Sequence, residues 1–290
     1  MTRALLLLLL LAACARGPVL VPEPRYVVGA GYQLGGHWSY PREDYALVEQ
    51  GLAVVLPAGT ARRTANGEVT DPTAMLAAHR TLQLPAIVLV TNLENGHALR
   101  LRVHDRGPVE RGRFLGVSRR AGELLGARPG LPFQARLEVL GEESRAAAEG
   151  LDGDRVQVGF TAAPVGAVGR ESLAPPDGAR GVAASAPARV MAAAADEPRR
   201  AAAPARLAET VTQAAARPGM LMVDGGSFFT FALARQAANR LGGTAEAVGP
   251  RSRQQEFRVR AGPFGSVAEA DAALARAVAA GLAGARIVVE

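Results

Sequence analysis

A long stretch of low-complexity sequence divides this chain and limits what it can fold into. Residues 142–217 are rich in Ala, Pro, Gly and Arg and contain few large apolar side chains. Burying so few apolar groups cannot offset the entropy that an ordered chain loses. We therefore expect a mostly disordered linker over 142–217, with a folded domain on each side. Hydrophobic residues make up 49% of the 290 residues, which is enough for two cores.

The N-terminus has the pattern of a bacterial export signal. Arg3 precedes the apolar run 4–11, and the sequence Leu-Ala-Ala-Cys closes the run at Cys14. The run is too short to span a bilayer, which takes roughly 20 residues, and small residues precede the expected cleavage site. The motif resembles a lipobox. We expect a signal peptide over 1–13, lipidation of Cys14 and a short tether over 14–24.

Two further expectations follow from this region. Cys14 is the only cysteine, so an exported form of the chain has no intramolecular disulfide and depends on packing alone. Ala15 stands after it, where an inner-membrane retention signal has Asp. The chain therefore resembles an outer-membrane lipoprotein, anchored on the periplasmic face of that membrane.

The region 25–141 alternates short apolar runs with turn residues, which predicts a β-rich domain. Residues 87–90 form a buried-strand run. In 99–104, Leu and Val alternate with Arg and His, which predicts a strand with a core face and a polar face. Asn95-Gly96 between these runs is typical of a tight hairpin turn. We also expect a short helix over 118–126 and a strand over 134–140.

The region 218–290 predicts a small α+β domain of ferredoxin-like or RNP-like type. Apolar residues at positions 233, 237 and 241 predict a helix over 231–241. The capping box 266–269 opens a second helix. The expected strands cover 221–223, 257–260 and 285–289.

The residues with candidate chemistry lie in two segments of the first domain. Glu68 follows an Asn-Gly turn, and Asp105 ends the alternating strand. Two carboxyl groups at one pocket are what cleavage of a glycosidic bond requires, with one of them protonated as the acid. His79 and several arginines lie close in sequence. A turn residue and a carboxylate paired with a neighbouring arginine are the alternative interpretation of the two acids.

These segments resemble the rare lipoprotein A family of bacterial septal lipoproteins, which are built on a double-psi β-barrel. The resemblance spans about 115 residues. It is carried by 62–68, 77–82, 90–96 and 105–108, and the upstream segment 32–45, with Trp38 and Tyr40, resembles the family's lead-in. The C-terminal region resembles a sporulation-related repeat (SPOR) domain through 226–228 and 258–264. Such domains bind peptidoglycan glycan strands stripped of their stem peptides. Lipobox, barrel, linker and SPOR domain in this order are also a family layout.

The resemblance implies a lytic transglycosylase that cleaves the bond between N-acetylmuramic acid and N-acetylglucosamine and leaves a 1,6-anhydro end. It implies Asp105 as acid and base, with Glu68 as its partner and His79 as an orienting or sugar-binding group. The implied substrate-binding residues are Arg62, Arg63, Thr64, Asn66 and Arg106. For the SPOR domain, the candidate glycan-binding residues are Ser227, Gln254 and Arg258.

The sequence departs from the family pattern beside the expected site. The family's Ala-Ser-Trp-Tyr-Gly loop reads Ala-Val-Val-Leu-Pro at 53–57, so aromatic side chains that would stack on sugars are missing. The family's Ile-Asp-Leu-Ser loses its acid at 115–118. A non-catalytic septal glycan-binding lipoprotein is therefore the alternative function. A weaker alternative is a carbohydrate-loosening module resembling expansins, and the three retained catalytic positions favour the enzyme.

The expected partners are denuded glycan strands, the membrane through lipidated Cys14, and divisome proteins at the septum. The net charge of +6 indicates polar or acidic surfaces in general. Because no basic run is interleaved with aromatic residues, nucleic acid is excluded as a partner. The spacing of the four histidines and the single cysteine indicates neither a metal site nor a cofactor.

Overall fold

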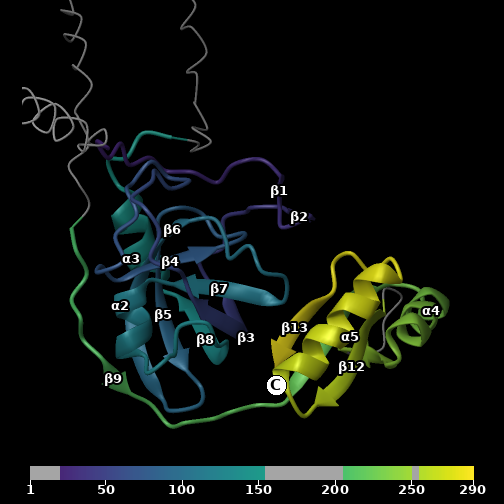
Figure 1. Cartoon of the computed structure of the whole chain (residues 1–290). Coiled ribbons are helices and arrows are strands. Elements are labelled where there is room, and N and C mark those ends of the chain that lie inside the picture. The colour runs from purple at the N-terminus through teal and green to yellow at the C-terminus, as the bar shows by residue number, and fades with distance from the viewer. Residues whose placement is uncertain (1–19, 154–204, 250–254) are drawn as a thin grey trace, which may run out of the picture. The chain divides into compact units, whose positions relative to one another are not determined.

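The computed structural model describes residues 20–153, 205–249 and 255–290 (Figure 1). The signal peptide, Cys14, the centre of the linker and Gln254 lie outside the described residues. Every helix in the described part of the chain is too short or too polar to cross a membrane.

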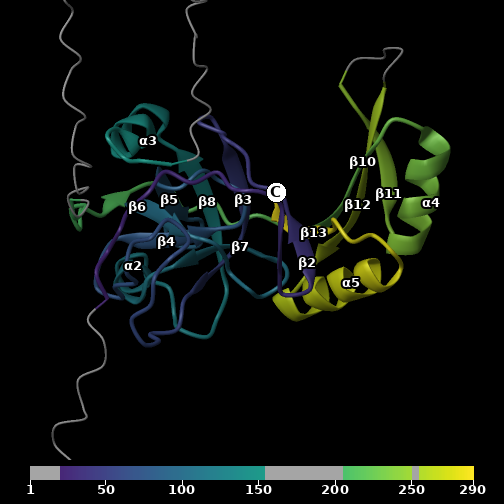
Figure 2. The same ribbon diagram turned by 90° about the horizontal axis from the view of Figure 1, so that it is seen from above.

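The N-terminal domain is a closed six-stranded barrel. Its strands follow the order β4-β7-β3-β8-β5-β6, and β6 pairs back onto β4 (Figure 2). The pairs β3–β7 and β4–β6 are parallel and the remaining pairs are antiparallel. This architecture confirms the predicted double-psi β-barrel. The strands are β3 (Val48–Val55), β4 (Leu76–His79), β5 (Ala86–Asn92), β6 (His97–Asp105), β7 (Arg113–Val117) and β8 (Phe133–Val139).

The predicted hairpin supplies two adjacent strands of the barrel wall. Strands β5 and β6 pair in register, with Val90 opposite Leu99 and Val88 opposite Leu101. Gly96 closes the turn with φ +81°, a conformation that favours glycine. These four apolar side chains are fully buried, so the hairpin is fixed by its core face.

The opposite face of β6 differs from the sequence expectation. Arg100 is exposed as expected, whereas Arg102 and His104 are buried. Residues 64–68 and strand β4 supply their polar partners, described below. The alternating pattern correctly predicted the strand, but alternation alone does not show what covers its polar face.

Smaller elements surround the barrel. The segment before β3 forms a hairpin of β1 (Tyr32–Leu34) and β2 (His37–Ser39). Helix α2 (Arg119–Leu124) confirms the predicted short helix, and its N-cap Ser118 accepts a hydrogen bond from the Ala121 amide.

The expected linker differs from the structure at both ends. Helix α3 (Gly141–Ala148) begins where the linker was expected to begin, and its buried Ser144 hydroxyl bonds the backbone of Ile87. At the other end, residues 205–217 run along the barrel, and we call this segment the strap (Figure 1). Its strand β9 (Thr212–Gln213) pairs with β6. Backbone pairing and the half-buried Leu207, which packs against the barrel core, hold the strap despite its composition.

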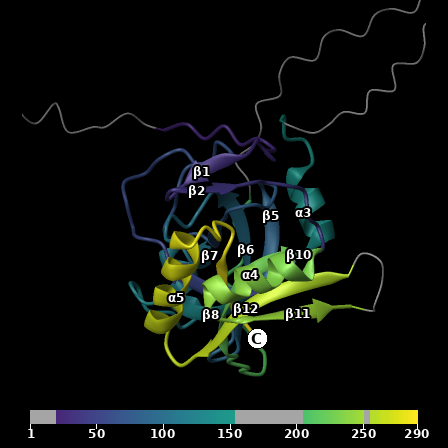
Figure 3. The ribbon, with the colours of Figure 1, turned by 90° about the vertical axis from the view of Figure 1, so that its right-hand side faces the viewer.

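The C-terminal domain is a four-stranded antiparallel sheet of order β11-β12-β10-β13. Both helices pack on one face of the sheet (Figure 3). The predicted α+β class is confirmed, whereas strand β11 was not expected because it is a short edge strand with few large apolar residues. The elements are β10 (Leu221–Phe228), α4 (Phe231–Leu241), β11 (Thr244–Val248), β12 (Glu256–Phe264), α5 (Val267–Ala279) and β13 (Arg286–Val289).

Candidate functional site

A pocket of about 360 Å³ opens where β6 ends. Three loops form most of its wall, at 56–60, 70–72 and 105–110. Three of the predicted site residues line it, namely Asp105, Arg62 and Arg106. The remaining wall residues are Leu76, Ala78, His104, Ser118 and Arg119.

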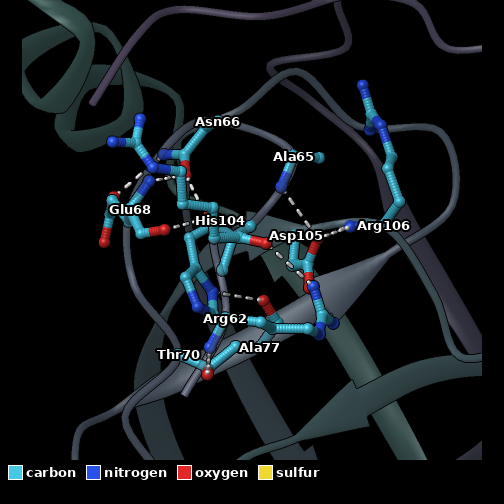
Figure 4. Close-up of polar contacts among 11 residues, drawn as sticks. Arg62, Ala65, Asn66, Glu68, Thr70, Ala77, His104, Asp105 and Arg106 are labelled. Carbon is cyan, nitrogen blue, oxygen red and sulfur yellow. Dashed lines mark hydrogen bonds and ion pairs between the residues drawn. The ribbon is translucent and has the colours of Figure 1, made fainter. Parts of the chain in front are cut away.

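Asp105 is the predicted catalytic carboxylate that lines the pocket, together with Asp71 and Glu110. Its Oδ1 accepts hydrogen bonds from the backbone amides of Ala65 (2.9 Å) and Arg106 (2.8 Å) (Figure 4). Its Oδ2 accepts from Nη2 of Arg62 at 2.5 Å. Only 5% of the residue is exposed, so three donors from two loops fix its direction. Such preorganisation is what a catalytic carboxyl group requires.

The turn before Glu68 folds for local reasons. The Thr64 amide donates to the Glu68 carbonyl at 2.8 Å, and the Gly67 amide donates to the Thr64 carbonyl at 3.0 Å. Gly67 has φ +83°, and a Cβ there would lie 2.1 Å from the Glu23 carbonyl oxygen. Only glycine fits this close approach. Asn-Gly thereby turns the chain so that Glu68 points inward.

Glu68 is buried behind the pocket and is absent from its wall. Its Oε1 accepts from Nδ2 of Asn66 at 2.9 Å (Figure 4). Its Oε2 accepts from Nη2 of Arg102 at 2.8 Å. Nη1 of Arg102 donates to the Ala205 carbonyl of the strap at 2.8 Å. The strap therefore supplies a second acceptor to the cation that pairs with Glu68.

His79 lies away from the pocket, although its family position predicts a catalytic role. Its Nδ1 accepts from the amides of Thr81 and Leu82, both at 3.2 Å. Nε2 therefore carries the proton and donates to Glu49 at 3.3 Å. The ring is 2% exposed and its edge packs on Phe114. Both nitrogens are engaged, and this arrangement assigns His79 to holding the turn after β4.

The environment of Glu49 supports this structural role. Burial alone would raise the pKa of the Glu49 carboxyl. The hydrogen bond from His79 and the positive charges of Arg286 and Arg42 outweigh burial, so the pKa is lowered. The carboxylate is therefore the stable form and a lasting acceptor for the imidazole.

Three of the other predicted binding residues lie outside the pocket wall. Arg63 pairs with Glu23 at the surface, with distances of 2.8 and 3.3 Å, and lies outside the pocket. Thr64 and Asn66 are buried, and the Thr64 hydroxyl donates to the Asn66 side-chain oxygen at 2.8 Å. They shape the turn and do not line the pocket.

Arg106 lines the pocket, but its guanidinium has protein partners. It donates to the carbonyls of Leu82 (2.5 Å) and Val28 (2.6 Å). Its charge also lies 5.8 Å from the centre of the Tyr32 ring, a cation–π distance. Arg106 thus connects the pocket wall to the β1–β2 hairpin.

The sequence analysis placed His104 on the polar face of its strand and did not assign it to the site. His104 is 4% exposed and lines the pocket beside Asp105. Nδ1 lies 3.1 Å from the Ala77 carbonyl and donates to it, whereas the buried Nε2 has no protein partner. Burial lowers the pKa of His104, against the opposing charges of Glu68 and Asp105. The imidazole is therefore a neutral hydrogen-bond acceptor. Its position directly before Asp105 was the signal that could have found it.

The structure brings together two of the three candidate residues in the C-terminal domain. Ser227 on β10 pairs directly with Arg258 on β12. Arg258 neighbours the buried Val259, so strand alternation places Arg258 and Ser227 on the sheet face opposite the helices. Gln254 lies outside the described residues.

Within residues 20–153, 205–249 and 255–290, no group of three or more His, Cys, Asp or Glu side chains is arranged to hold an ion.

Both folded domains match known domain families. Residues 49–135 match the domain family described as lytic transglycolase, and residues 221–287 match the SPOR domain family. The chain therefore combines these two domains, which confirms the resemblance inferred from the sequence.

Curated relatives share the name endolytic peptidoglycan transglycosylase RlpA. The protein of Rickettsia bellii is 33% identical over 129 residues, which cover 43% of this chain and 57% of the relative. The protein of Escherichia coli O157:H7 is 32% identical over 123 residues, covering 39% and 34%. A shorter match to the Yersinia pestis protein is 50% identical over 62 residues, covering 21% and 17%. The match with the first relative spans little more than half of that relative's length.

Proposed function

We propose that this protein is a peptidoglycan lytic transglycosylase whose barrel cleaves glycan strands. The observation that carries the proposal is Asp105, held by three donors at the wall of the pocket. The names of the relatives and the two domain matches support the same activity.

In the proposed reaction, the Asp105 carboxyl protonates the glycosidic oxygen as the bond from that oxygen to C1 of N-acetylmuramic acid breaks. The resulting carboxylate then accepts the proton of the sugar's 6-hydroxyl, whose oxygen forms a new bond to C1. No water is consumed, so one carboxyl group acts first as acid and then as base. The product is a 1,6-anhydro end.

The Glu68–Arg102 pair acts from behind the pocket wall. Neither side chain lines the pocket, so neither contacts the reacting atoms. The pair instead joins the 64–68 turn to β6, the strand that ends at Asp105, and so helps to hold the loop that donates to Asp105.

The location and partners of the enzyme are part of the proposal. The lipobox ending at Cys14 supports a lipid anchor on the periplasmic face of the outer membrane. The SPOR domain supports binding of denuded glycan and enrichment at the division septum, where divisome proteins are the expected partners. Incorporation of labelled palmitate that disappears in Cys14→Ser tests the anchor.

Digestion of peptide-free glycan by the whole chain tests the activity. The expected result is release of fragments whose masses show 1,6-anhydro ends. Release of fragments with hydrated reducing ends would show that the enzyme is a hydrolase and not a transglycosylase. Binding of the glycan without any fragments would favour the non-catalytic alternative, which the aromatic-free wall at 56–60 supports.

A further inference from the structure

Two large aromatic side chains lie exposed on the β1–β2 hairpin. Trp38 is 60% exposed and Tyr40 is 69% exposed. Their rings stack with centroids 6.3 Å apart and planes inclined by 17°. Strand alternation explains the pair, because Ser39 between them is buried and the side chains at 38 and 40 point to the other face. Exposed aromatic surface of this kind marks binding sites more often than chance contacts.

The hairpin is fastened to the wall of the pocket. The Gly36 carbonyl accepts from Nη2 of Arg111 at 3.3 Å. Gly35 has φ +60°, and a Cβ there would lie 2.3 Å from the Val109 carbonyl oxygen. Only glycine permits this approach. Val109 and Glu110 belong to the pocket wall, so the hairpin turn packs directly on that wall.

A second set of contacts fixes the base of the hairpin. The Tyr32 hydroxyl donates to the Arg80 carbonyl at 2.8 Å. Nη2 of Arg80 donates to the carbonyls of Val109 and Glu110, both at 3.2 Å. Arg106, which lines the pocket, places its guanidinium by the Tyr32 ring. The aromatic pair therefore has a fixed position relative to Asp105.

We propose that Trp38 and Tyr40 form a glycan-binding platform beside the pocket, an inference that rests on the proposed function. Pyranose rings present apolar C–H faces, and flat aromatic rings offer matching surface with little loss of side-chain entropy. A glycan strand seated at Asp105 extends beyond the pocket on both sides of the bond that is cleaved. The 56–60 wall supplies no aromatic ring, and the platform supplies this surface from the hairpin.

The occupant is a sugar strand rather than a protein because charged side chains line the pocket on which the hairpin turn packs. Asp105, Arg62 and Arg119 line that pocket. Hydroxyl and amide groups of a glycan satisfy such charged donors and acceptors while its ring faces cover the aromatics.

Trp38 is the only tryptophan in the chain, so its fluorescence reports on the platform directly. The test uses the whole chain carrying Asp105→Asn, so that the probe, a peptide-free glycan octasaccharide, is not consumed. We expect a saturable blue shift of the emission and reduced quenching by acrylamide. Binding at the SPOR domain alone does not produce this signal, because that domain contains no tryptophan.

Variants distinguish the loss of ring stacking on the sugar from a loss of folding. Tyr40→Phe keeps the ring and should bind like the parent, whereas Tyr40→Ala should weaken the fluorescence-detected affinity by about fivefold to tenfold. Leu131→Ala, which removes an exposed apolar side chain outside the pocket wall, is the matched control and should change nothing.

The outcomes distinguish this inference from the proposed function. Unchanged emission and quenching at glycan concentrations that the wild type cleaves would overturn the platform and leave the enzyme standing. A saturable fluorescence change without cleavage by the wild type would support the platform and overturn the enzyme.

Discussion

The barrel and the C-terminal domain bury polar groups very differently. Of the thirteen buried polar or charged side chains in the described part of the chain, only Asp224 belongs to the C-terminal domain. The helices of that domain instead bury mainly alanines. Buried charges are costly unless partners are in place, and the C-terminal domain carries its candidate binding residues Ser227 and Arg258 on a sheet face instead. The contrast indicates that the chemistry belongs to the barrel.

The largest expected effect is the loss of glycan cleavage in Asp105→Asn, which should leave glycan binding intact. Asp105→Asn keeps the shape of the side chain but removes the proton donor and acceptor, so the cleavage rate should fall about 100- to 10,000-fold. Mass analysis of glycan products over time measures the rate. Asp44→Asn, which changes a carboxylate outside the pocket wall, is the control. Wild-type turnover by Asp105→Asn would assign the acid to another group.

A second substitution tests the cost of the buried charges. Arg102→Met leaves the Glu68 carboxylate buried without its cation, so the free energy of unfolding should fall by about 3–5 kcal/mol. Arg100→Met on the same strand is the matched control. Its exposed pair with Glu143 should contribute less than about 1 kcal/mol. Urea unfolding measures both, and equal losses would show that burial does not set the cost.

The pH dependence of stability tests the buried histidine. Burial lowers the pKa of His104, so below its ordinary value of 6.5 the unfolded chain takes up a proton before the folded chain does. Its contribution is therefore present above pH 6.5 and is lost as the pH falls toward the folded pKa. His104→Asn, which keeps a donor for the Ala77 carbonyl, should lose less stability between pH 7 and pH 5. Parallel curves for the two proteins would refute this.

The smallest expected effect concerns glycan binding by the C-terminal domain. Arg258→Ala should weaken sedimentation with denuded glycan by a few-fold and leave cleavage of a short soluble glycan unchanged. Arg235→Ala removes the same charge from the exposed surface of α4 and is the control. A loss of cleavage with the short substrate would contradict the division of roles.

Local patterns predicted most of the fold. The β5–β6 hairpin followed from two apolar runs around Asn-Gly, and α5 followed from its Ser266 cap, which accepts from the Glu269 amide. Strand β11 was missed because it is short and has few large apolar residues. The strap was missed because pairing with the distant strand β6, rather than its own composition, orders it.

The site shows the same division. Family position singled out Asp105 in the sequence, and the structure places it at the pocket wall. The burial of His104 and the engagement of both His79 nitrogens depend on which strands meet, which the alternation pattern does not specify. Burial by distant segments is therefore what sequence reasoning lacked.

One measurement tests the division of roles most directly. Wild type and Asp105→Asn are incubated separately with insoluble amidase-treated glycan, and each tube is assayed for sedimented protein and for soluble anhydro-ended fragments. We predict equal sedimentation of both proteins and fragments from the wild type alone. Fragments from both proteins, or loss of sedimentation in Asp105→Asn, would contradict the account of a barrel that cleaves and a separate domain that binds.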